Sequence, residues 1–477
     1  MQFESVIGLE IHIQLATESK IFCSCSTEFG KPPNTNTCPV CLGLPGALPV
    51  LNRKVPELAA KLGLALNCEI RIDSQFSRKN YFYPDLPKAY QISQFDRPIC
   101  ENGWLEINTQ GRGKSRIGIT RIHMEEDAGK LVHDNASSES KVDLNRAGVP
   151  LLEIVSEPDI RSAEEAKVYM EKIHAIATTI GVSDGDMEKG HLRCDANVSL
   201  RPKGQKDFGT RTETKNLNSF RFVQNAIDYE IERQREEILD DIKIEQETRL
   251  WDTDRKVTFS MRSKEEADEY RYFPDPDLPL AKLSHELIET LRRNLPELPD
   301  SKKQRFMQEY GLNEYDAGVL TASHELSEYF EKVLEIGAVP KIACNWITGE
   351  LTRVMNESAK NLSKIKMSPE NLANLTILID QGEISSKIAK TVFSEILVSG
   401  KTPTKIIEEK GLKKITDEKE LGKIVEGLLD SNPQQVKQYR EGKIKVIGFF
   451  VGQMMKQTQG KGDPAIINHL LKKKLDG

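Results

Sequence analysis

Hydrophobic and polar residues alternate along much of the first 290 or so residues of the chain. Two clear examples are SVIGLEIHIQL at 5–15 and RIGITRIHMEE at 116–126. A period of two is typical of a β-strand with one buried face. This pattern therefore predicts an N-terminal part that is rich in sheet.

Two stretches within this part predict helices instead. Ser162 and Glu165 form a capping box, the following apolar residues repeat at intervals of three and four, and Gly181 supplies a stop. A second, highly charged helix is expected from about 219 to 239. Helices are thus expected to interrupt the strands.

The strand pattern ends after NLPELPD at 294–300. Three helical runs are expected from there to about 398, followed by a linker at 399–405, SGKTPTK. The remaining residues again predict helices, one of them beginning at the cap-and-first-turn pair Asp463 and Pro464.

A chain of 477 residues is too long for one hydrophobic core. We expect an α+β protein with three parts. They are a large mixed α/β domain with a mainly antiparallel sheet at 1–293, an all-helical domain at 294–404 and a small helical tail at 405–477.

Charge is spread unevenly along the chain. The whole chain has a net charge of −6, yet residues 405–477 carry 15 Lys and Arg against 10 Asp and Glu. A basic tail on an acidic body indicates either contact with a polyanion or a solvated helical surface. The start MQFESVIGLE does not resemble a signal peptide, and the sequence has no apolar run of membrane-spanning length, so a cytoplasmic protein is expected.

Four of the eight cysteines form one group in the sequence. Cys23 and Cys25 are followed after twelve residues by Cys38 and Cys41. Paired thiolates at such spacing can surround a structural zinc ion, whereas four unrelated thiols are the alternative. The other four are expected to be small core residues: Cys68, Cys100, Cys194 and Cys344.

The most unusual acidic stretch is EEDAGK, in which Glu125, Glu126 and Asp127 are consecutive. His123 precedes Glu125 by two residues, as Glu10 precedes His12, and residues two apart share one face of a strand. Two such strands could bring carboxylates and imidazoles together around a divalent cation such as Mg²⁺. The alternative is a solvent-facing turn with His12 merely packed.

Basic and aromatic residues are interleaved in SRKNYFYPDLPKAYQ at 77–91. Arg78, Lys79 and Lys88 could hold phosphates while the neighbouring aromatic rings stack on a base; ordinary core aromatics are the alternative. Further polar residues that could line a cleft are Asp195, Glu213, Lys215, Asn216 and Asn218.

Two familiar motifs are incomplete. Gly113-Lys114-Ser115 lacks the glycine that a P-loop needs five residues before it, and is better explained as a hairpin turn. Ser385 precedes Ser386 and Lys387 as in some amidases, but it is expected to cap a helix. Because the chain also lacks a G-x-S-x-G elbow, we find no nucleophile for amide hydrolysis.

Long and unusual strings across nearly the whole chain resemble the GatB/GatE family, the B-type subunits of tRNA-dependent amidotransferases, in the GatB form. The strings that carry this resemblance are VIGLEIHIQL, RKNYFYPDLPKAYQISQ, ITRIHMEEDAGK, VDLNRAGVPLLEIVSEPDI, LRCDANVSLRP, KNLNSF, YRYFPDPDLP and FFVGQMMKQTQGKGDP. The resemblance implies a cradle-shaped catalytic domain, then a helical domain and a tail that contacts tRNA.

The same resemblance implies a carbon–nitrogen ligase with glutamine as amide donor. A partner amidase, the A component of the complex, would release ammonia, and a small C component would complete a heterotrimer. The B component would use ATP to phosphorylate the side-chain carboxylate of Glu-tRNA(Gln) or Asp-tRNA(Asn). The alternative is a zinc-stabilised, tRNA-binding scaffold without chemistry of its own.

Residue roles follow from the resemblance in the same way. Glu10, His12 and Glu125 are expected to hold Mg²⁺, with Glu126 and Asp127 beside them. Lys79 and Lys88 are expected to steady phosphates. The residues expected to line the cleft for the aminoacyl end are Asp195, Glu213 and Lys215.

Overall fold

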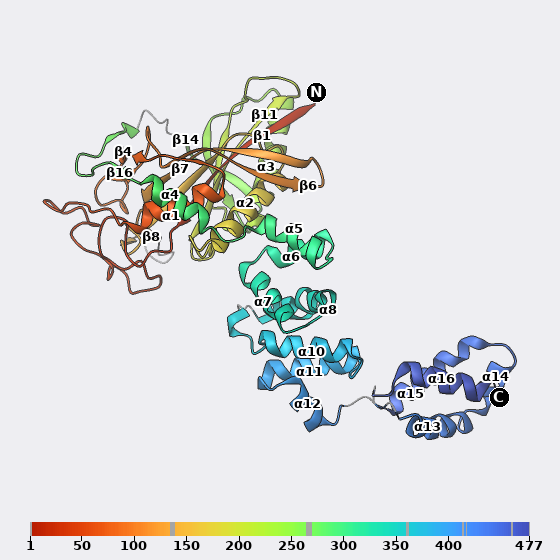
Figure 1. Cartoon of the computed structure of the whole chain (residues 1–477). Helices are drawn as coiled ribbons and strands as arrows, with labels where there is room; N and C mark the ends of the chain where they lie inside the picture. Colours follow the sequence, from red (N-terminus) through yellow and green to blue (C-terminus); the bar gives the residue numbers. More distant parts are fainter. Residues whose placement is uncertain are drawn as a thin grey trace. The chain divides into compact units, whose positions relative to one another are not determined.

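The structure is a computed structural model. It describes residues 2–133, 139–263, 270–358, 362–412, 415, 417–458 and 461–476. The chain divides into two compact units, Met1–Pro299 and Asp300–Gly477. Every strand named among the described residues lies in the first unit, whereas the second is helical (Figure 1). The expected α+β fold is thus confirmed.

A nine-stranded sheet forms the centre of the first unit. In spatial order its strands are β14 (Val257–Ser263), β13 (Glu247–Asp252), β12 (Thr212–Lys215), β11 (Leu192–Pro202), β1 (Phe3–Gln14), β10 (Pro150–Ser156), β7 (Gly113–Glu126), β6 (Cys100–Thr109) and β2 (Glu69–Ile70). Neighbouring strands are antiparallel except for β12 and β13, which run parallel. The sheet is therefore mainly antiparallel, as expected.

The two faces of this sheet differ in polarity. Leu9 and Ile11 of β1 belong to the main hydrophobic cluster, whereas Glu10 and His12 alternate with them and point to the opposite face. The helices that pack against the sheet or against one another on the apolar side are α1 (Lys54–Ala65), α2 (Ala163–Thr179), α3 (Phe220–Leu239) and α4 (His285–Arg293). The opposite face is left free for a polar site.

The two predicted helices of this unit are confirmed, with their caps. The Ser162 side chain accepts a hydrogen bond from the backbone N–H of Glu165, and Ser219 accepts one from Phe222. Gly181 follows α2 with a φ of +68°, a conformation that favours glycine. Local capping chemistry is therefore sufficient to place both helix starts.

Short strands extend the first unit beyond the large sheet. They are β4 (Ser77–Asn80), β5 (Tyr90–Ser93) and β15 (Phe273–Pro274) in one small sheet, β3 (Asp73–Ser74) with β16 (Ala281–Lys282), and β8 (Lys130–His133) with β9 (Ser140–Asp143). The pairing of β15 with β4 brings the segment around 270–277 next to residues 77–80. The Gly-Lys-Ser sequence at 113–115 begins β7 after the β6–β7 hairpin turn, which agrees with its interpretation as a turn.

The second unit consists of helices. They are α5 (Pro299–Glu309), α6 (Glu314–Thr321), α7 (His324–Glu335), α8 (Pro340–Asn345), η2 (Trp346–Leu351), α9 (Thr352–Ser358), η3 (Leu362–Lys364), α10 (Pro369–Asp380), α11 (Ser386–Ser399), α12 (Pro403–Lys410), α13 (Glu418–Asp430), α14 (Pro433–Arg440), η4 (Ile444–Val446), α15 (Ile447–Gln457) and α16 (Pro464–Leu475). The expectation of three helical runs before 398 is wrong, because turns divide this region into more and shorter helices.

Ser385 caps α11 and Asp463 caps α16, both as expected. Buried residues form one cluster between Phe306 and Ile407 and another between Leu421 and Leu475. The expected linker at 399–405 is only partly irregular, since α12 already begins at Pro403. Ile407 packs in the cluster that begins at Phe306, although residues from 405 onward were assigned to the tail. The division into three domains stays a prediction. Among the described residues, no helix is long and apolar enough to cross a membrane.

Candidate active-site cleft and cysteine cluster

A cavity of about 980 Å³ lies on the polar face of the large sheet. Strands β1, β7, β10, β11 and β12 each contribute charged side chains to its wall. Of the predicted site residues, those that line it are Glu10, His12, Lys79, Glu125, Asp195, Glu213 and Lys215, together with Asp127, Asn216 and Asn218. The structure therefore brings most of the predicted residues into one cleft.

Strand register places two histidines and two carboxylates side by side. β10 lies between β1 and β7, and Glu153 of β10 is opposite both His12 and His123. The Nε2 atom of His12 lies 3.2 Å from a Glu153 oxygen and 3.8 Å from a Glu125 oxygen. The Nε2 atom of His123 lies 3.4 Å and 3.5 Å from the same two carboxylates.

This group is buried and strongly coupled. Burial alone would lower the pKa of His123, but the carboxylates of Glu153 and Glu125 outweigh it and raise that pKa to about 9. Burial would raise the pKa of Glu153, yet the two histidines hold it well below its usual value. Burial would lower the pKa of His12, but its hydrogen bond to Glu153 and the negative charges of Glu153 and Glu125 together raise it. The group is thus a set of mutually neutralising charges.

One nitrogen and two carboxylate oxygens in this group could bind a divalent cation. Ligand atoms of His12, Glu125 and Glu153 all lie within 4.8 Å of one another. Sequence reasoning missed Glu153. The available signal was a single glutamate within the otherwise apolar strand PLLEIVS, which is hard to explain in a buried strand unless the glutamate has polar partners.

A second acidic group lies beside the first. Ligand atoms of Glu10, Asp195 and Glu213 also lie within 4.8 Å of one another. Lys215 pairs with Asp195 at 2.5 Å and with Glu213 at 3.4 Å, and these carboxylates raise its pKa against the opposing effect of burial. The three residues expected to hold one Mg²⁺ therefore lie in two different groups. His12 and Glu125 belong to the first group and Glu10 belongs to the second.

The three consecutive carboxylates are all buried, so the alternative of a solvent-facing turn is wrong. Glu125 joins the two histidines. Glu126 pairs with Lys88 and accepts a hydrogen bond from the backbone N–H of Ile92 at 2.8 Å. Each carboxylate thus has its own positive or donating partner, which offsets their mutual repulsion.

Asp127 accepts hydrogen bonds from Arg193 and Gln14, both at 2.9 Å. Burial would raise the pKa of Asp127, but Arg193 and Arg146 outweigh it and lower that pKa. Arg193, which also lines the cleft, was missed in the sequence, as were Arg121 and Arg211. Isolated arginines on strands carry no spacing signal that would have identified them.

Lys79 lies in the cleft among aromatic rings, as its surrounding sequence indicates. Its Nζ atom is 4.7 Å from the centre of the Tyr270 ring and 5.9 Å from that of Tyr81. Phe95 and Tyr272 stack beside it with ring centres 4.3 Å apart. This corner combines a cation with flat aromatic surfaces.

Lys88, Glu126 and Arg78 are not among the residues that line the cleft. Lys88 and Glu126 instead line a small pocket of about 130 Å³ beside the cysteines. Arg78 pairs with Asp275 at 2.9 Å and with Asp277 at 2.8 Å. These three residues thus hold segments of the first unit together around the cleft.

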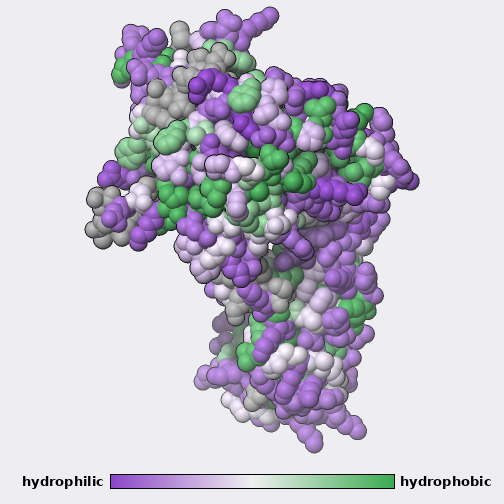
Figure 2. Space-filling view, turned by 90° about the vertical axis from the view of Figure 1, so that its left-hand side faces the viewer, coloured by the Kyte–Doolittle hydropathy of each residue, from purple (hydrophilic) through white to green (hydrophobic). Residues whose placement is uncertain are grey.

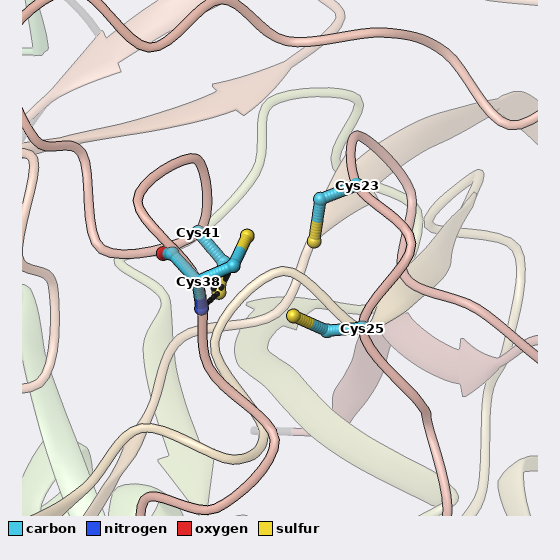
Figure 3. A group of neighbouring side chains, drawn as sticks. All are labelled: Cys23, Cys25, Cys38 and Cys41. Carbon is cyan, nitrogen blue, oxygen red and sulfur yellow. Dashed lines mark hydrogen bonds between the residues drawn. The ribbon is translucent and has the colours of Figure 1, made fainter.

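The four grouped cysteines converge as their spacing indicates. Cys23 and Cys25 come from one turn and Cys38 and Cys41 from another, and the side chains point toward one another (Figure 3). Their sulfur atoms all lie within 4.8 Å of one another. The hydrogen bond from the Cys23 thiol lowers the pKa of Cys41 to about 4. Four sulfur donors around one point are a donor set that suits zinc.

The remaining four cysteines are buried, as expected of core residues: Cys68, Cys100, Cys194 and Cys344. Burial raises the pKa of the Cys68 thiol to about 12. Such thiols are poor nucleophiles, because the reactive form is the thiolate. They therefore add no candidate chemistry to the cleft.

Comparison with known proteins agrees with this architecture. The family model described as GatB/GatE catalytic domain matches residues 5–289, and the one described as GatB domain matches residues 328–475. Among similar proteins are the B subunits of the aspartyl/glutamyl-tRNA(Asn/Gln) amidotransferases of Geotalea daltonii, 58% identical, Geobacter sulfurreducens, 57%, and Persephonella marina, 56%, each over the full length of both chains. The chain therefore belongs to the GatB/GatE family, as the GatB subunit of a tRNA-dependent amidotransferase.

Proposed function

We propose that this chain uses ATP to phosphorylate the side-chain carboxylate of glutamate or aspartate attached to tRNA(Gln) or tRNA(Asn). Ammonia from a partner amidase, the A component, then displaces phosphate and leaves an amide, and a small C component completes the assembly. The observation that carries this proposal is the cleft. There, two acidic groups and several cations line one face of a rigid sheet.

The arrangement suits phosphoryl transfer, which depends on positioning and charge neutralisation more than on a protein nucleophile. His12, Glu125 and Glu153 would hold Mg²⁺, and Glu10, Asp195 and Glu213 offer a second set of oxygen donors. When bound, Mg²⁺ neutralises charge on phosphate oxygens. Carboxylate-rich donor sets are the ones that hard divalent cations prefer.

The cations of the cleft have distinct proposed roles. Lys79 carries a charge among aromatic rings and would orient phosphates, while the stacked Phe95 and Tyr272 offer a surface for a base. Lys215 pairs with Asp195 and Glu213 and would align the aminoacyl end. Lys88 would act from outside the cleft, because its pairing with Glu126 holds the chain next to Glu125.

The four cysteines would hold a structural zinc ion. Four thiolates complete a tetrahedral shell, so no position is left for a substrate or a reactive water. The proposed role is to fix the two turns at 23–25 and 38–41 against the first unit. This zinc takes no part in the chemistry of the cleft.

Partner contacts would use surfaces that are apolar or basic. Figure 2 shows hydrophobic residues grouped in several places on one face of the molecule. Exposed large apolar side chains near the cysteine turns are Phe29, Leu44, Leu48 and Val50. The basic tail would contact the tRNA backbone, since neutralising phosphates releases counter-ions.

The proposal is tested with the chain assembled with its A and C partners and given Mg-ATP, ammonium chloride and Glu-tRNA(Gln). Free ammonium bypasses the amidase and isolates the chemistry of this chain. Gln-tRNA formed by wild type and lost in Glu125→Ala supports the proposal. Equal product from both would refute the role of the cleft. ATP consumption and product that both stay unchanged when the acidic groups of the cleft are removed would favour the non-catalytic scaffold.

A further inference from the structure

Lys20 lies just before the first cysteine pair, and its side chain is completely buried. A buried ammonium group is costly unless anions or several acceptors face it. Among the described residues, no carboxylate forms an ion pair with Lys20. Its Nζ atom donates hydrogen bonds to the carbonyl oxygens of Asn36 at 2.7 Å and Leu144 at 3.3 Å, and it lies 3.6 Å from the Cys41 sulfur.

These three neighbours match the three N–H donors of a lysine ammonium group. Two acceptors are neutral carbonyls, so the Cys41 sulfur is the one neighbour that can carry a negative charge. The packing is close on the remaining side, since a Cβ atom added at Gly148 would lie 3.5 Å from both Cys41 Cβ and Lys20 Cδ. The charge of Lys20 is therefore directed at the cysteine cluster.

We propose that Lys20 is the built-in counter-ion of the four-cysteine cluster, donating a hydrogen bond to the Cys41 thiolate and strengthening zinc retention. The inference rests on the proposed structural zinc. Four thiolates carry more negative charge than Zn²⁺ neutralises, and their sulfur atoms all lie within 4.8 Å of one another, so the excess charge is concentrated at one point. The ammonium group of Lys20, 3.6 Å from the Cys41 sulfur, offsets part of this excess and so stabilises the zinc-bound cluster.

Lys20 also connects the cluster to the cleft. Leu144, which accepts one of its hydrogen bonds, precedes the segment 145–149 that leads into β10. In that segment the backbone N–H of Gly148 donates to the Asp127 carbonyl at 2.8 Å, and the N–H of Asp127 donates to Val149 at 2.8 Å. A change at Lys20 therefore acts on zinc retention directly and on the cleft wall through this segment.

The test uses the full-length chain, purified with zinc, and follows zinc transfer to a colorimetric chelator. Lys20→Met removes the charge at similar length, and Lys20→Gln removes the charge but keeps a donor. Both are expected to lower zinc affinity by about tenfold to a hundredfold, as loss of groups that support metal ligands does. The matched control is Lys31→Met, which removes a lysine of the same loop that is exposed and pairs with Glu28 at 3.1 Å.

The control is expected to retain zinc like wild type. Lys20→Met and Lys20→Gln variants that also retain zinc like wild type would overturn the proposal while leaving the zinc site intact. Lys20→Gln decides the question if Lys20→Met does not fold. A wild-type chain that binds no zinc would instead refute the zinc site itself, and this inference with it.

A second measurement tests whether Lys20 acts as a counter-ion to the cysteine cluster or only as a hydrogen-bond donor to the two carbonyl groups. Thermal melts are compared with zinc bound and after its removal by chelation. Loss of the two carbonyl hydrogen bonds affects both forms, whereas loss of the counter-ion affects only the zinc-bound form, so Lys20→Met is expected to lower the melting temperature of the zinc-bound chain more than that of the zinc-free chain. An equal decrease in both forms would show that Lys20 acts only through the carbonyls of Asn36 and Leu144.

Discussion

Replacing Glu153 with glutamine tests the central arrangement of the cleft. The substitution keeps the shape of the side chain and removes the charge that lies between His12 and His123. It therefore perturbs the electrostatics of the site with little change in packing. Glu153 is also the member of the site that the sequence did not reveal, so the result depends on the strand register seen in the structure.

The expected magnitude follows from the pKa of His123, which is raised to about 9 from an ordinary 6.5. This difference corresponds to about 3 kcal/mol of favourable interaction with the ionised form. Glu153 and Glu125 share it, so loss of one charge is expected to lower the free energy of unfolding by about 1.5 kcal/mol. Because the folded-state pKa is raised, this stabilisation is fully present below about pH 6.5 and is lost as the pH rises through about 9.

The assay is urea denaturation of wild type and Glu153→Gln without added Mg²⁺, at pH 6.5 and at pH 10. The variant is expected to be less stable at pH 6.5 and close to wild type at pH 10. Glu106→Gln is the control, because Glu106 is exposed on β6 of the same sheet, and this variant is expected to match wild type at both pH values. A stability difference of the same size at both pH values would refute the electrostatic reasoning.

Three further predictions concern the cleft, the cysteines and the tail. Lys79→Met is expected to lower transamidation with free ammonium by about tenfold to a hundredfold, mainly through weaker use of ATP, and unchanged ATP dependence would contradict the role of this lysine. Freshly purified chain is expected to contain close to one zinc ion, measured by atomic emission, and far less would contradict a Cys23–Cys41 zinc site. Truncation after Leu412, which leaves α12 in its hydrophobic cluster, is expected to weaken tRNA binding and to flatten its salt dependence in filter-binding assays, whereas unchanged binding would exclude a tRNA contact by the tail.

Several features of this protein follow from the sequence alone, because they depend on local chemistry. The alternation around Glu10 and His12 requires both side chains to share a strand face, and the structure confirms it. Ser162 and Ser219 cap their helices because each has an extended backbone and precedes backbone N–H groups that lack a partner within the helix. The spacing of the four cysteines likewise limits how far apart their two turns can lie.

Only the tertiary structure decided how the strands are ordered, and this order assembles the cleft. Glu153 enters it because β10 pairs with both β1 and β7, a choice made by long-range hydrogen bonding that no short window of sequence encodes. The same order separates Glu10 from His12, since Glu10 meets Asp195 of β11 on one side of β1 while His12 meets Glu153 on the other.

The consecutive carboxylates show the same limit. Sequence spacing predicts that Glu125, Glu126 and Asp127 lie close together, but not that each is buried against a different partner. Lys88, Arg193 and His12 reach them from segments far apart in the chain. Periodicity determines which face of a strand a side chain occupies. Its charge partners depend on which distant strands pack beside it, and the order of those strands depends on burial and hydrogen bonding over the whole first unit.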